Sequence, residues 1–524
     1  MLDFLFITSP TNARNPHPPY YFMYLASYLR NKGLDVKIID PKGGDRPDDM
    51  KLHMLDIVSK VAENTSRFVG LAAFHSDYDM ILELGEMIKF VQPHTTLLVG
   101  NAHATLNPED FIYSISPFDI AVLGEGEVTC LEIWKWYEEW SINNLDALSK
   151  VKGIAYYDPD QVEPFVRTGK RHVLNMADLS YPDYHLIDMQ YYLRPQKLII
   201  RRIYTSMVCV FAGRGCPFDC SFCAANNVWQ ANKGKACRLR PVNNVIQELC
   251  HLKNYYNPDF FYLFDDMFGM SKKWMREWFD EKAVFDYALT TNEKFGVPFP
   301  YATQTRADIA SEEMIKGLKE TGCIQLDIGV ESGSQTLLDG VNKKITLDQI
   351  RQVFSWCKKY KLRSFATMLL NLPGETEQDL KLTYNFLKEI KPSAGVIFGV
   401  TTPYPGTKIY QRHCEPLRRD EYRLLINNRL NPSQDRFKMS SHNLDLWKLL
   451  EKWNRRFKAT PAFERMWALR PFQKLYWKAI FNSTRKKEYM GCWIKDLFKT
   501  LILYGFHITR LYKLVKKMQY KDKY

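Results

Sequence analysis

The segment GRGCPFDCSFC, residues 213–223, places three cysteines at a C-x3-C-x2-C spacing directly after an apolar, strand-like run, Met207 to Ala212. The short spacers bring Cys216, Cys220 and Cys223 onto one tight loop. Three thiolates arranged in this way can bind three irons of a 4Fe-4S cluster, because soft sulfur ligands suit iron–sulfur clusters. The fourth iron would then accept a ligand from outside the chain. The alternatives are a zinc site, which usually requires a fourth protein ligand, and a group of buried thiols.

The length and composition of the chain predict a globular, multidomain protein. Its 524 residues, 46% of them hydrophobic, suffice for two or three domains with a sizeable core in each. The eleven cysteines form no regular disulfide framework, and a thiolate-held cluster needs a reducing compartment, so we expect the cytoplasm. The N-terminus resembles a first β-strand and lacks a basic signal-peptide region. No apolar run reaches the roughly 18 residues of a membrane span.

Residues 1–140 alternate apolar runs of strand length with amphipathic helical stretches. This alternation predicts an α/β domain with a doubly wound parallel sheet, Rossmann-like and flavodoxin-like in type. The expected strands are residues 3–8, 35–40, 67–74, 95–100 and 118–123, and the expected helices are 20–31, 50–63, 79–91 and 127–140. A ligand would lie across the carboxyl ends of the strands, where the loops are rich in glycine and other small residues.

A second series of strands and helices follows a linker. Residues 141–205 have no strong period and contain several proline breakers, so we expect a linker with one hairpin, residues 151–157 with 162–167. Residues 206–410 form the second series, with strands expected at 207–212, 260–264, 301–305, 324–330, 364–370 and 395–400. Active sites of parallel barrels gather at the C-terminal strand ends, and each of these ends carries polar residues.

Residues 411–524 are expected to be a basic, aromatic-rich helical region. Residues 441–524 carry 20 Lys and Arg against 6 Asp and Glu, a net charge of +14, whereas the whole chain carries +13. Basic helices with an aromatic and aliphatic face can lie on an anionic membrane surface. The alternative is a helical lid over the barrel mouth. We expect no nucleic-acid partner, since no recognisable binding module accompanies the charge.

The cysteine spacing, with the aromatic Phe222 directly before the last cysteine, resembles the signature of the radical S-adenosylmethionine (SAM) superfamily. The resemblance implies a partial (β/α)6 barrel, a 4Fe-4S cluster on the three cysteines, and SAM bound to the fourth iron. It also implies SAM contacts from residues at the strand ends. These are Phe222, Asp265, Asp266, Gln304, Arg306, Glu331, Ser332 and Asn371, the last standing where glycine is commoner.

Residues 1–140 resemble the cobalamin-binding domain that precedes the barrel in one branch of this superfamily. The similarity rests on Pro18-Pro19, on VGNAHAT at 99–105 and on GEGE at 124–127. Asn101-Ala102 replaces the commoner Gly-Pro, and the D-x-H-x-x-G cobalt-binding motif is absent. The implied cobalamin contacts are Ser9, Pro10, His75, Ser76, Gly100, Asn101, His103, Ala104, Thr105, Gly124, Glu125 and Gly126. His75 could ligate cobalt, cover the lower face of the corrin ring or cap the next helix.

Taken together, the chain resembles a cobalamin-dependent radical SAM enzyme. Such an enzyme cleaves SAM to a 5′-deoxyadenosyl radical, removes hydrogen from an unactivated carbon and, in the commonest outcome, transfers a methyl group from methylcobalamin. The first alternative is a radical oxidative cyclase, as in anaerobic magnesium-protoporphyrin ester cyclase. The second is a cobalamin-binding regulatory or carrier protein with an inactive barrel. The implied partners are a small-molecule or lipid-like substrate and an electron donor such as flavodoxin or ferredoxin.

Overall fold

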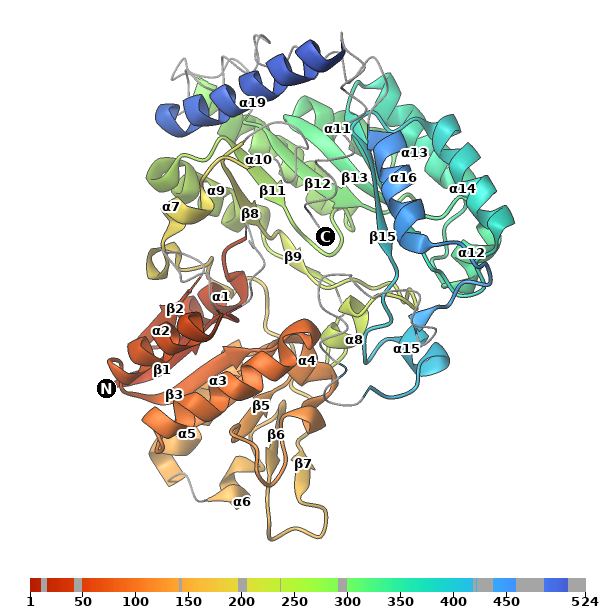
Figure 1. The fold of residues 1–524 in the computed structure, drawn as a ribbon. Helices are drawn as coiled ribbons and strands as arrows, with labels where there is room; N and C mark the ends of the chain where they lie inside the picture. The colour runs from red at the N-terminus through yellow and green to blue at the C-terminus, as the bar shows by residue number, and fades with distance from the viewer. Residues whose placement is uncertain are drawn as a thin grey trace.

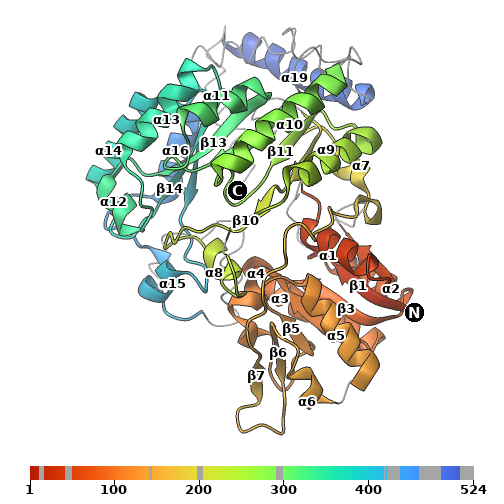
Figure 2. The same cartoon turned by 180° about the vertical axis from the view of Figure 1, so that it is seen from behind.

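The computed structural model describes residues 1–10, 17–41, 50–140, 144–196, 205–235, 237–290, 299–417, 421, 437–458 and 485–507. Two α/β units contain most of these residues (Figures 1 and 2). The N-terminal unit lies at one end of the larger unit, and helix α19 (Lys486–His507) lies at the other end. Much of the predicted helical region 411–524 lies outside the described residues.

Seven strands form one sheet in the described part of the N-terminal unit, in the order β2-β1-β3-β4-β5-β6-β7. The pairs from β2 to β5 are parallel, and the order 2-1-3-4-5 is that of the flavodoxin-like doubly wound fold, so the predicted fold class is confirmed. The strands are β1 (Leu2–Ile7), β2 (Val36–Ile39), β3 (Ser66–Ala72), β4 (Thr96–Gly100), β5 (Ile120–Val122), β6 (Ile154–Tyr157) and β7 (Phe165–Arg167). The helices are α1 (Tyr20–Arg30), α2 (Met50–Ala62), α3 (Tyr78–Val91), α4 (Asn101–Leu106), α5 (Glu127–Trp140) and α6 (Leu145–Leu148).

Strand β1 shows why this sheet is covered on both faces. Phe4 and Phe6 belong to the apolar core that contains residues of α1 and α5, whereas Leu5 and Ile7 belong to the core that contains residues of α2 and α3. Successive side chains of a strand point to opposite faces, so a run of consecutive apolar residues suits a sheet buried on both sides. The short helix α4 was not predicted, because it follows β4 directly, without an intervening turn.

The predicted hairpin is present and extends the N-terminal sheet. β6 pairs antiparallel with β5 and with β7. Ile154 and Tyr156 are buried in the same core as Ile120, to which they add apolar surface. Residues 154–167 of the predicted linker are therefore part of the N-terminal sheet. Helix α7 (Met189–Tyr192) lies further along the predicted linker and precedes the second unit.

The second unit contains six parallel strands, in chain order, among the residues that the structure describes. They are β8 (Met207–Val210), β11 (Phe260–Leu263), β12 (Tyr301–Thr305), β13 (Cys323–Glu331), β14 (Arg363–Leu370) and β15 (Gly395–Val400). The helices are α9 (Val242–Tyr256), α10 (Lys272–Thr290), α11 (Glu312–Glu320), α12 (Gln335–Gly340), α13 (Leu347–Lys359) and α14 (Glu377–Ile390). The larger ones lie along the outer face of the sheet (Figure 2). The two outer strands, β8 and β15, each pair with a neighbour on one side only, so the sheet does not close into a full barrel. The predicted partial barrel is therefore confirmed.

Two C-terminal helices cover exposed parts of this barrel. Helix α16 (Leu446–Lys458) lies along the edge strand β15, where Phe398 N donates to Asn454 Oδ1 over 3.2 Å. Helix α19 lies across the N-terminal ends of β8 and β11, where Tyr489 Oη accepts from Ser206 N over 3.0 Å and donates to Asp259. A barrel of parallel strands has its mouth at the C-terminal strand ends. The prediction of a lid over the mouth is therefore wrong for α19.

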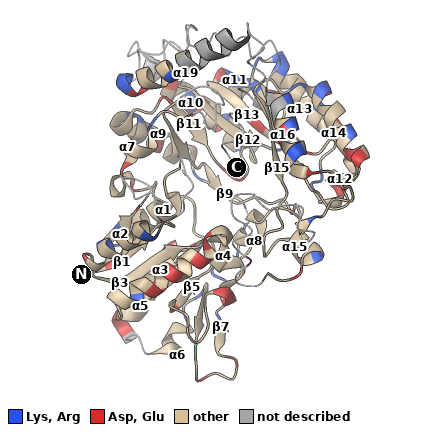
Figure 3. Cartoon of the chain, in the orientation of Figure 1, with Lys and Arg blue, Asp and Glu red and all other residues tan. Residues whose placement is uncertain are grey.

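None of the described helices combines the length and the low polarity that crossing a membrane requires. Basic side chains are present on α16 and at the start of α19 (Figure 3).

Candidate active site

The three cysteines lie on a loop between the two-residue strand β9 (Gly213–Arg214) and helix α8 (Ala225–Trp229). All three are partly buried. Burial raises the pKa of the Cys216 thiol and that of the Cys223 thiol, the latter to about 11, and the charge of Cys220 contributes to both. The sulfurs are therefore close enough to interact electrostatically. In the described part of the chain no three His, Cys, Asp or Glu side chains converge on a single metal ion. A cubane cluster does not require such convergence, because each thiolate binds a different iron.

Main-chain contacts fix the middle of this loop to the barrel. Ser221 N donates to Val341 O over 2.9 Å, and Ser221 O accepts from Ile409 N over 3.1 Å. Asn342 Nδ2 donates to Asp219 O over 2.8 Å. The loop is thus bound to the segments that follow α12 and β15, and its cysteines are held by the far side of the barrel.

Arg306, predicted as a SAM contact at the end of β12, reaches the cysteine loop. Its Nη1 donates to Cys220 Sγ over 3.3 Å, and its guanidinium carbon lies 3.7 Å from the centre of the Phe218 ring. Asp308 accepts from Nε over 2.9 Å, and Lys343 O accepts from Nη2 over 2.5 Å. A buried guanidinium therefore lies beside one of the three sulfurs and links the loop to two neighbouring segments.

Asp265 and Asp266, at the end of β11, hold the start of the loop. Asp265 Oδ1 accepts from Ala212 N over 2.7 Å and from Gly213 N over 3.1 Å, while its Oδ2 is buried without a hydrogen-bond partner among the described residues. Burial raises the pKa of Asp265 to about 8, although these two amides lower it. Asp266 Oδ2 accepts from Gly215 N over 3.2 Å and from Trp229 Nε1 over 2.7 Å. Both carboxyl groups therefore tie the end of β11 to the start of the cysteine loop.

Glu331 and Phe222 are connected through a lysine. Glu331, at the end of β13, adopts a left-handed backbone conformation with φ of 64°. Its Oε1 pairs with Lys343 Nζ over 2.7 Å, and that nitrogen lies 5.8 Å from the centre of the Phe222 ring. Phe222 packs against the small apolar cluster of Leu337, Val341 and Leu372.

The other three predicted SAM contacts already bond protein groups. Gln304 Nε2 donates to Asp265 O over 2.6 Å. Ser332 Oγ is buried 3.3 Å from Thr383 Oγ1. The side chain of Asn371, at the end of β14, bonds four main-chain groups of the two segments that follow β15 and precede α16. Both Nδ2 and Oδ1 of this side chain therefore take part in holding the two segments together.

A cavity of about 590 Å³ lies at the carboxyl ends of the N-terminal strands and faces the barrel. Residues of α1, β3, β4 and β5 line it from one side, and the N-terminal unit's ligand site was expected at this edge. From the other side it is lined by barrel residues, including Arg214, Trp229 and Asp266. The cavity therefore reaches the base of the cysteine loop.

Half of the predicted cobalamin contacts line this cavity, namely Gly100, Asn101, Thr105, Gly124, Glu125 and Gly126. Ser9, Pro10, His75, Ser76, His103 and Ala104 are not among its lining residues. Ser9 Oγ is buried and has no hydrogen-bond partner within the described residues.

His75 packs away from the cavity. Its ring stacks on that of His103 with centroids 4.2 Å apart, and burial, followed by the charge of His103, holds its pKa well below the ordinary value. His103 Nε2 pairs with Asp110 Oδ2 over 2.7 Å. Phe74 lines the cavity in place of His75. Adjacent residues of an extended segment point to opposite sides, which explains why Phe74 lines the cavity and His75 does not.

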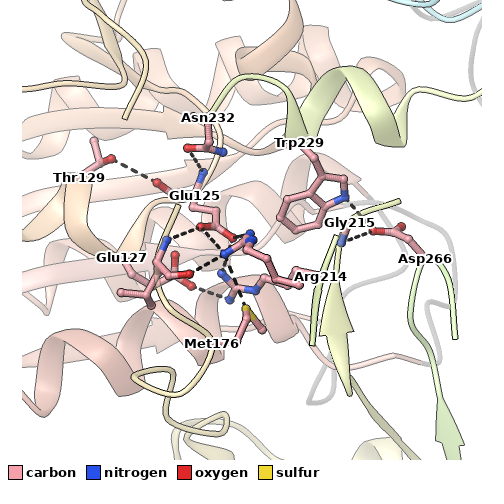
Figure 4. Close-up of polar contacts among 11 residues, drawn as sticks. Glu125, Glu127, Thr129, Met176, Arg214, Gly215, Trp229, Asn232 and Asp266 are labelled. Atoms are coloured by element: carbon pink, nitrogen blue, oxygen red, sulfur yellow. Dashed lines mark hydrogen bonds and ion pairs between the residues drawn. The ribbon is translucent and has the colours of Figure 1, made fainter. Parts of the chain in front are cut away.

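Four charged residues between the two units were not predicted to act together (Figure 4). Arg214 Nη1 pairs with Glu125 Oε1 over 3.2 Å, and its Nη2 pairs with Glu127 Oε1 over 2.6 Å. Arg238 Nη2 pairs with Glu125 Oε1 over 2.5 Å. Burial raises the pKa of Glu125, but the guanidinium groups of Arg214 and Arg238 together hold it below the ordinary value. The GEGE sequence is therefore in contact with the cysteine loop.

The residues present fit the implied cofactors. Three thiols on one loop beside a guanidinium match the ligand set that a 4Fe-4S cluster with one open iron would require. The unpartnered Asp265 Oδ2 can accept from an ammonium group. The cavity of about 590 Å³ has the glycine-lined rim that a large planar ligand requires, and it reaches Arg214 at the base of the cysteine loop.

Comparison with protein families agrees with this geometry. The model of the radical SAM superfamily matches residues 210–387, and that of the B12-binding domain matches residues 11–133. The chain therefore carries a radical SAM domain and a B12-binding domain. The predicted recognition is thereby confirmed, and so are the cofactors that these two domains use, a 4Fe-4S cluster, SAM and cobalamin.

Characterised and uncharacterised relatives extend over both domains of this radical SAM protein. An uncharacterised methyltransferase of Pyrococcus horikoshii is 27% identical over 402 residues, which are 75% of this chain and 78% of the relative. The anaerobic magnesium-protoporphyrin IX monomethyl ester cyclase of Cereibacter sphaeroides is 25% identical over 395 residues, 75% of this chain and 60% of the cyclase. The radical SAM methyltransferase TsrM of Kitasatospora setae has a similar fold, with a TM-score of 0.61 at 17% identity, covering 78% of this chain and 75% of TsrM.

Proposed function

We propose that this protein is a cobalamin-dependent radical SAM C-methyltransferase. One observation carries the proposal: the cavity of the B12-binding domain is lined by Arg214 and Asp266, which flank and hold the base of the cysteine loop. The two cofactor sites are therefore adjacent. The methyltransferase relative from Pyrococcus horikoshii, which matches over most of both chains, also supports this assignment.

In this proposal Cys216, Cys220 and Cys223 hold the cluster. When bound, the cluster supplies one electron that cleaves SAM to methionine and a 5′-deoxyadenosyl radical, and methylcobalamin supplies the methyl group. Arg306 stabilises negative charge on Cys220 by hydrogen bonding to its sulfur. Asp265 accepts from the amino group of SAM through Oδ2.

The remaining SAM contacts are proposed from their positions around the same loop. Phe222 and Glu331 would contact SAM, and Lys343 holds the Glu331 carboxylate in place. Gln304 and Ser332 shape this space through their hydrogen bonds to Asp265 O and Thr383. Asn371 acts by holding residues 437–440 over the end of β14.

The test is anaerobic reconstitution of the full chain with iron, sulfide and cobalamin, followed by SAM and a reductant. We expect a corrinoid spectrum together with 5′-deoxyadenosine and S-adenosylhomocysteine. If 5′-deoxyadenosine appears without S-adenosylhomocysteine, a non-methylating enzyme such as an oxidative cyclase replaces this proposal. Absence of both products and of a cluster would overturn the enzymatic function and favour a cobalamin-binding carrier.

Cysteine variants sharpen this experiment. Cys216→Ala is expected to lose the cluster and 5′-deoxyadenosine formation while retaining the corrinoid spectrum. Cys250→Ala, on α9 and outside the cysteine loop, is the matched control and should retain both. A carrier protein with an inactive barrel would be insensitive to both substitutions.

The partners proposed for this enzyme are a small-molecule or lipid-like substrate and an electron donor such as flavodoxin or ferredoxin. A donor is required because each reductive cleavage of SAM consumes one electron. We place the enzyme in the cytoplasm, because thiolate-held clusters are assembled under reducing conditions.

A peripheral membrane contact through α19 is part of this proposal. Met490 and Ile494 are 37% and 45% exposed, and Lys487 lies on the same helical face. An exposed apolar face beside lysines suits an anionic lipid surface. Co-sedimentation with phosphatidylserine vesicles should exceed that with phosphatidylcholine vesicles and should fall in Ile494→Glu. Recovery no greater than that without vesicles would exclude the contact.

A further inference from the structure

Glu125 and Glu127 connect the B12-binding domain to the cysteine loop through a single arginine. Arg214 is bonded at one guanidinium nitrogen by Glu125 and at the other by Glu127. The three side chains are only 5–13% exposed. Figure 4 shows the two carboxylates directed at the guanidinium from the segment that follows β5. The planar, two-pronged guanidinium can satisfy both at once, which a lysine cannot.

Arg214 lies at the base of the cysteine loop. It is the last residue of β9, and one residue separates it from Cys216. Its cross-strand partner is Arg238, in the antiparallel pair of β9 with β10 (Arg238–Leu239). Glu125 binds this partner as well, so one carboxylate holds both strands of the ribbon from which the loop begins.

The contacts continue into the segment between the domains. Glu125 Oε2 accepts from Leu174 N over 3.1 Å, and Arg238 Nη1 donates to Leu174 O over 2.7 Å. Glu125 N lies 3.5 Å from Asn232 Oδ1, on the chain that follows α8. Three other segments therefore meet at the Glu125 carboxylate, and a fourth contacts the main-chain nitrogen of the same residue.

This network has a cost that packing alone would avoid. Moving charges out of water is expensive, and apolar side chains of similar size often stabilise a buried site better than an ion pair. Directed ion pairs do provide a defined geometry, because each bond restricts direction as well as distance. Arg214, Glu125 and Glu127 also line the cavity of the B12-binding domain, so the network forms its wall toward the cysteine loop.

We propose that Glu125 and Glu127 are positioning residues, which orient the cysteine loop relative to the B12-binding domain through Arg214. The inference rests on the proposed function for its catalytic consequence, since methyl transfer depends on the placement of the two cofactor sites. The structural part of it concerns this chain's own residues and can be tested in the absence of both cofactors.

The first experiment is hydrogen–deuterium exchange on the full chain without added cofactor. Glu127→Gln removes one of the two charges on Arg214 and leaves the shape of the side chain unchanged. We expect peptides covering residues 212–223 to exchange about tenfold faster in this variant than in the wild type, because the loop opens locally more often. Exchange at the wild-type rate would overturn the inference.

The matched control is Glu132→Gln. Glu132 lies on α5, the helix that begins at Glu127, and forms a two-pronged pair with Arg171. It bonds no residue of the cysteine loop. It should leave exchange of residues 212–223 unchanged. If Glu132→Gln accelerates that segment as much as Glu127→Gln, general loosening of the domain accounts for the effect and the inference fails.

The second experiment measures the separation of the two cofactors by pulsed electron paramagnetic resonance between the reduced cluster and cob(II)alamin. Wild-type protein should give one narrow distance distribution, and Glu127→Gln a broader one at unchanged iron and corrinoid content. Identical distributions would contradict the positioning role. If the wild type binds no corrinoid, the proposed function fails, whereas the exchange experiment still decides the role of Glu127.

Discussion

Arg306 donates a hydrogen bond from Nη1 to Cys220 Sγ over 3.3 Å, so that a buried guanidinium lies beside a thiol of the cysteine loop. The same side chain bonds Asp308 and Lys343 O and lies over the Phe218 ring. Arg306 therefore combines an electrostatic effect on one sulfur with a structural effect on the loop. Two substitutions can separate these effects.

Arg306→Met is expected to lower the reduction potential of the reconstituted cluster. Hydrogen bonds and positive charge at a cluster sulfur favour the reduced state, and their loss disfavours it. We expect a shift on the order of −60 mV, which corresponds to a tenfold change for a one-electron couple. The measurement is a redox titration followed by electron paramagnetic resonance of the reduced cluster.

Arg306→Lys is the comparison for this measurement. It retains a positive charge but lacks the fork that reaches both Cys220 and Asp308. A potential near that of the wild type would assign the effect to charge, and a potential near that of Arg306→Met would assign it to the hydrogen bond. An unchanged potential in both variants would mean that Arg306 serves only to hold the loop.

Gly124→Ala should destabilise the contact between the two units. Gly124 has φ of 75°, and an added Cβ would lie 2.4 Å from Asn232 Nδ2. A left-handed alanine alone costs about 1–2 kcal/mol, and the contact with Asn232 adds to this. We expect the unfolding free energy to fall by roughly 2–3 kcal/mol in urea titrations.

The design includes a control and a rescue. Gly169→Ala meets no atom within 4 Å and should change stability by no more than about 0.5 kcal/mol. Gly124→Ala with Asn232→Ala removes the clash and should recover part of the loss, since neighbouring substitutions are not additive. Without any recovery, the backbone conformation alone would account for the cost.

The barrel was largely predictable because its strands are short apolar runs with polar ends. The expected strands 301–305 and 395–400 coincide with β12 and β15. Polar residues directly after these strands converge because the carboxyl ends of parallel strands meet at one edge. The positions of Asp265, Asp266 and Arg306 around the cysteine loop follow from this rule.

The contact between the domains could not be predicted in the same way. Glu125 and Arg214 are 89 residues apart, and β9 and β10 are two residues each, too short for a periodic signal. The GEGE sequence was assigned to cofactor binding because its glycines suit a ligand loop, while the partners of its carboxylates lie in another domain. Strand alternation could have predicted the orientation of His75. It places Phe74 and His75 on opposite sides of the chain, so that only one of them lines the cavity.

Asn371→Asp is expected to release the segment 437–442 from the end of β14. Asn371 Nδ2 donates to Thr401 O over 3.2 Å and to Phe437 O over 2.9 Å. A carboxylate oxygen at this position would face two carbonyl oxygens and leave both without a donor. We expect a loss of about 2–3 kcal/mol in unfolding free energy and faster proteolysis within 437–442.

The control is the same asparagine-to-aspartate substitution at Asn443, directly after this segment. Asn443 is exposed, and its Oδ1 accepts from Lys438 Nζ over 2.9 Å, so Asn443→Asp keeps the contact. It should show wild-type stability and proteolysis. Equal proteolysis in Asn371→Asp and the wild type would show that other contacts, such as that of Glu375 with His442, suffice to hold the segment.

His17 should make the stability of the cofactor-free protein depend on pH. Its ring stacks on Phe264 with centroids 5.4 Å apart, and burial lowers its pKa from 6.5 to about 4. Between these values the unfolded chain binds a proton that the folded chain does not, so stability falls as the pH falls from 6.5 to 4. The full effect is about 3 kcal/mol, at 1.36 kcal/mol for each pH unit.

His17→Phe keeps an aromatic ring against Phe264 and removes the titrating group. Relative to the wild type, this variant should therefore gain stability on acidification, and the difference in urea midpoint between the two proteins should change between pH 7 and pH 4.5. The exposed His94 provides the control, since His94→Phe should follow the wild type at both pH values. A pH-independent difference between His17→Phe and the wild type would mean that His17 has the same pKa in the folded and the unfolded chain, and would overturn this prediction.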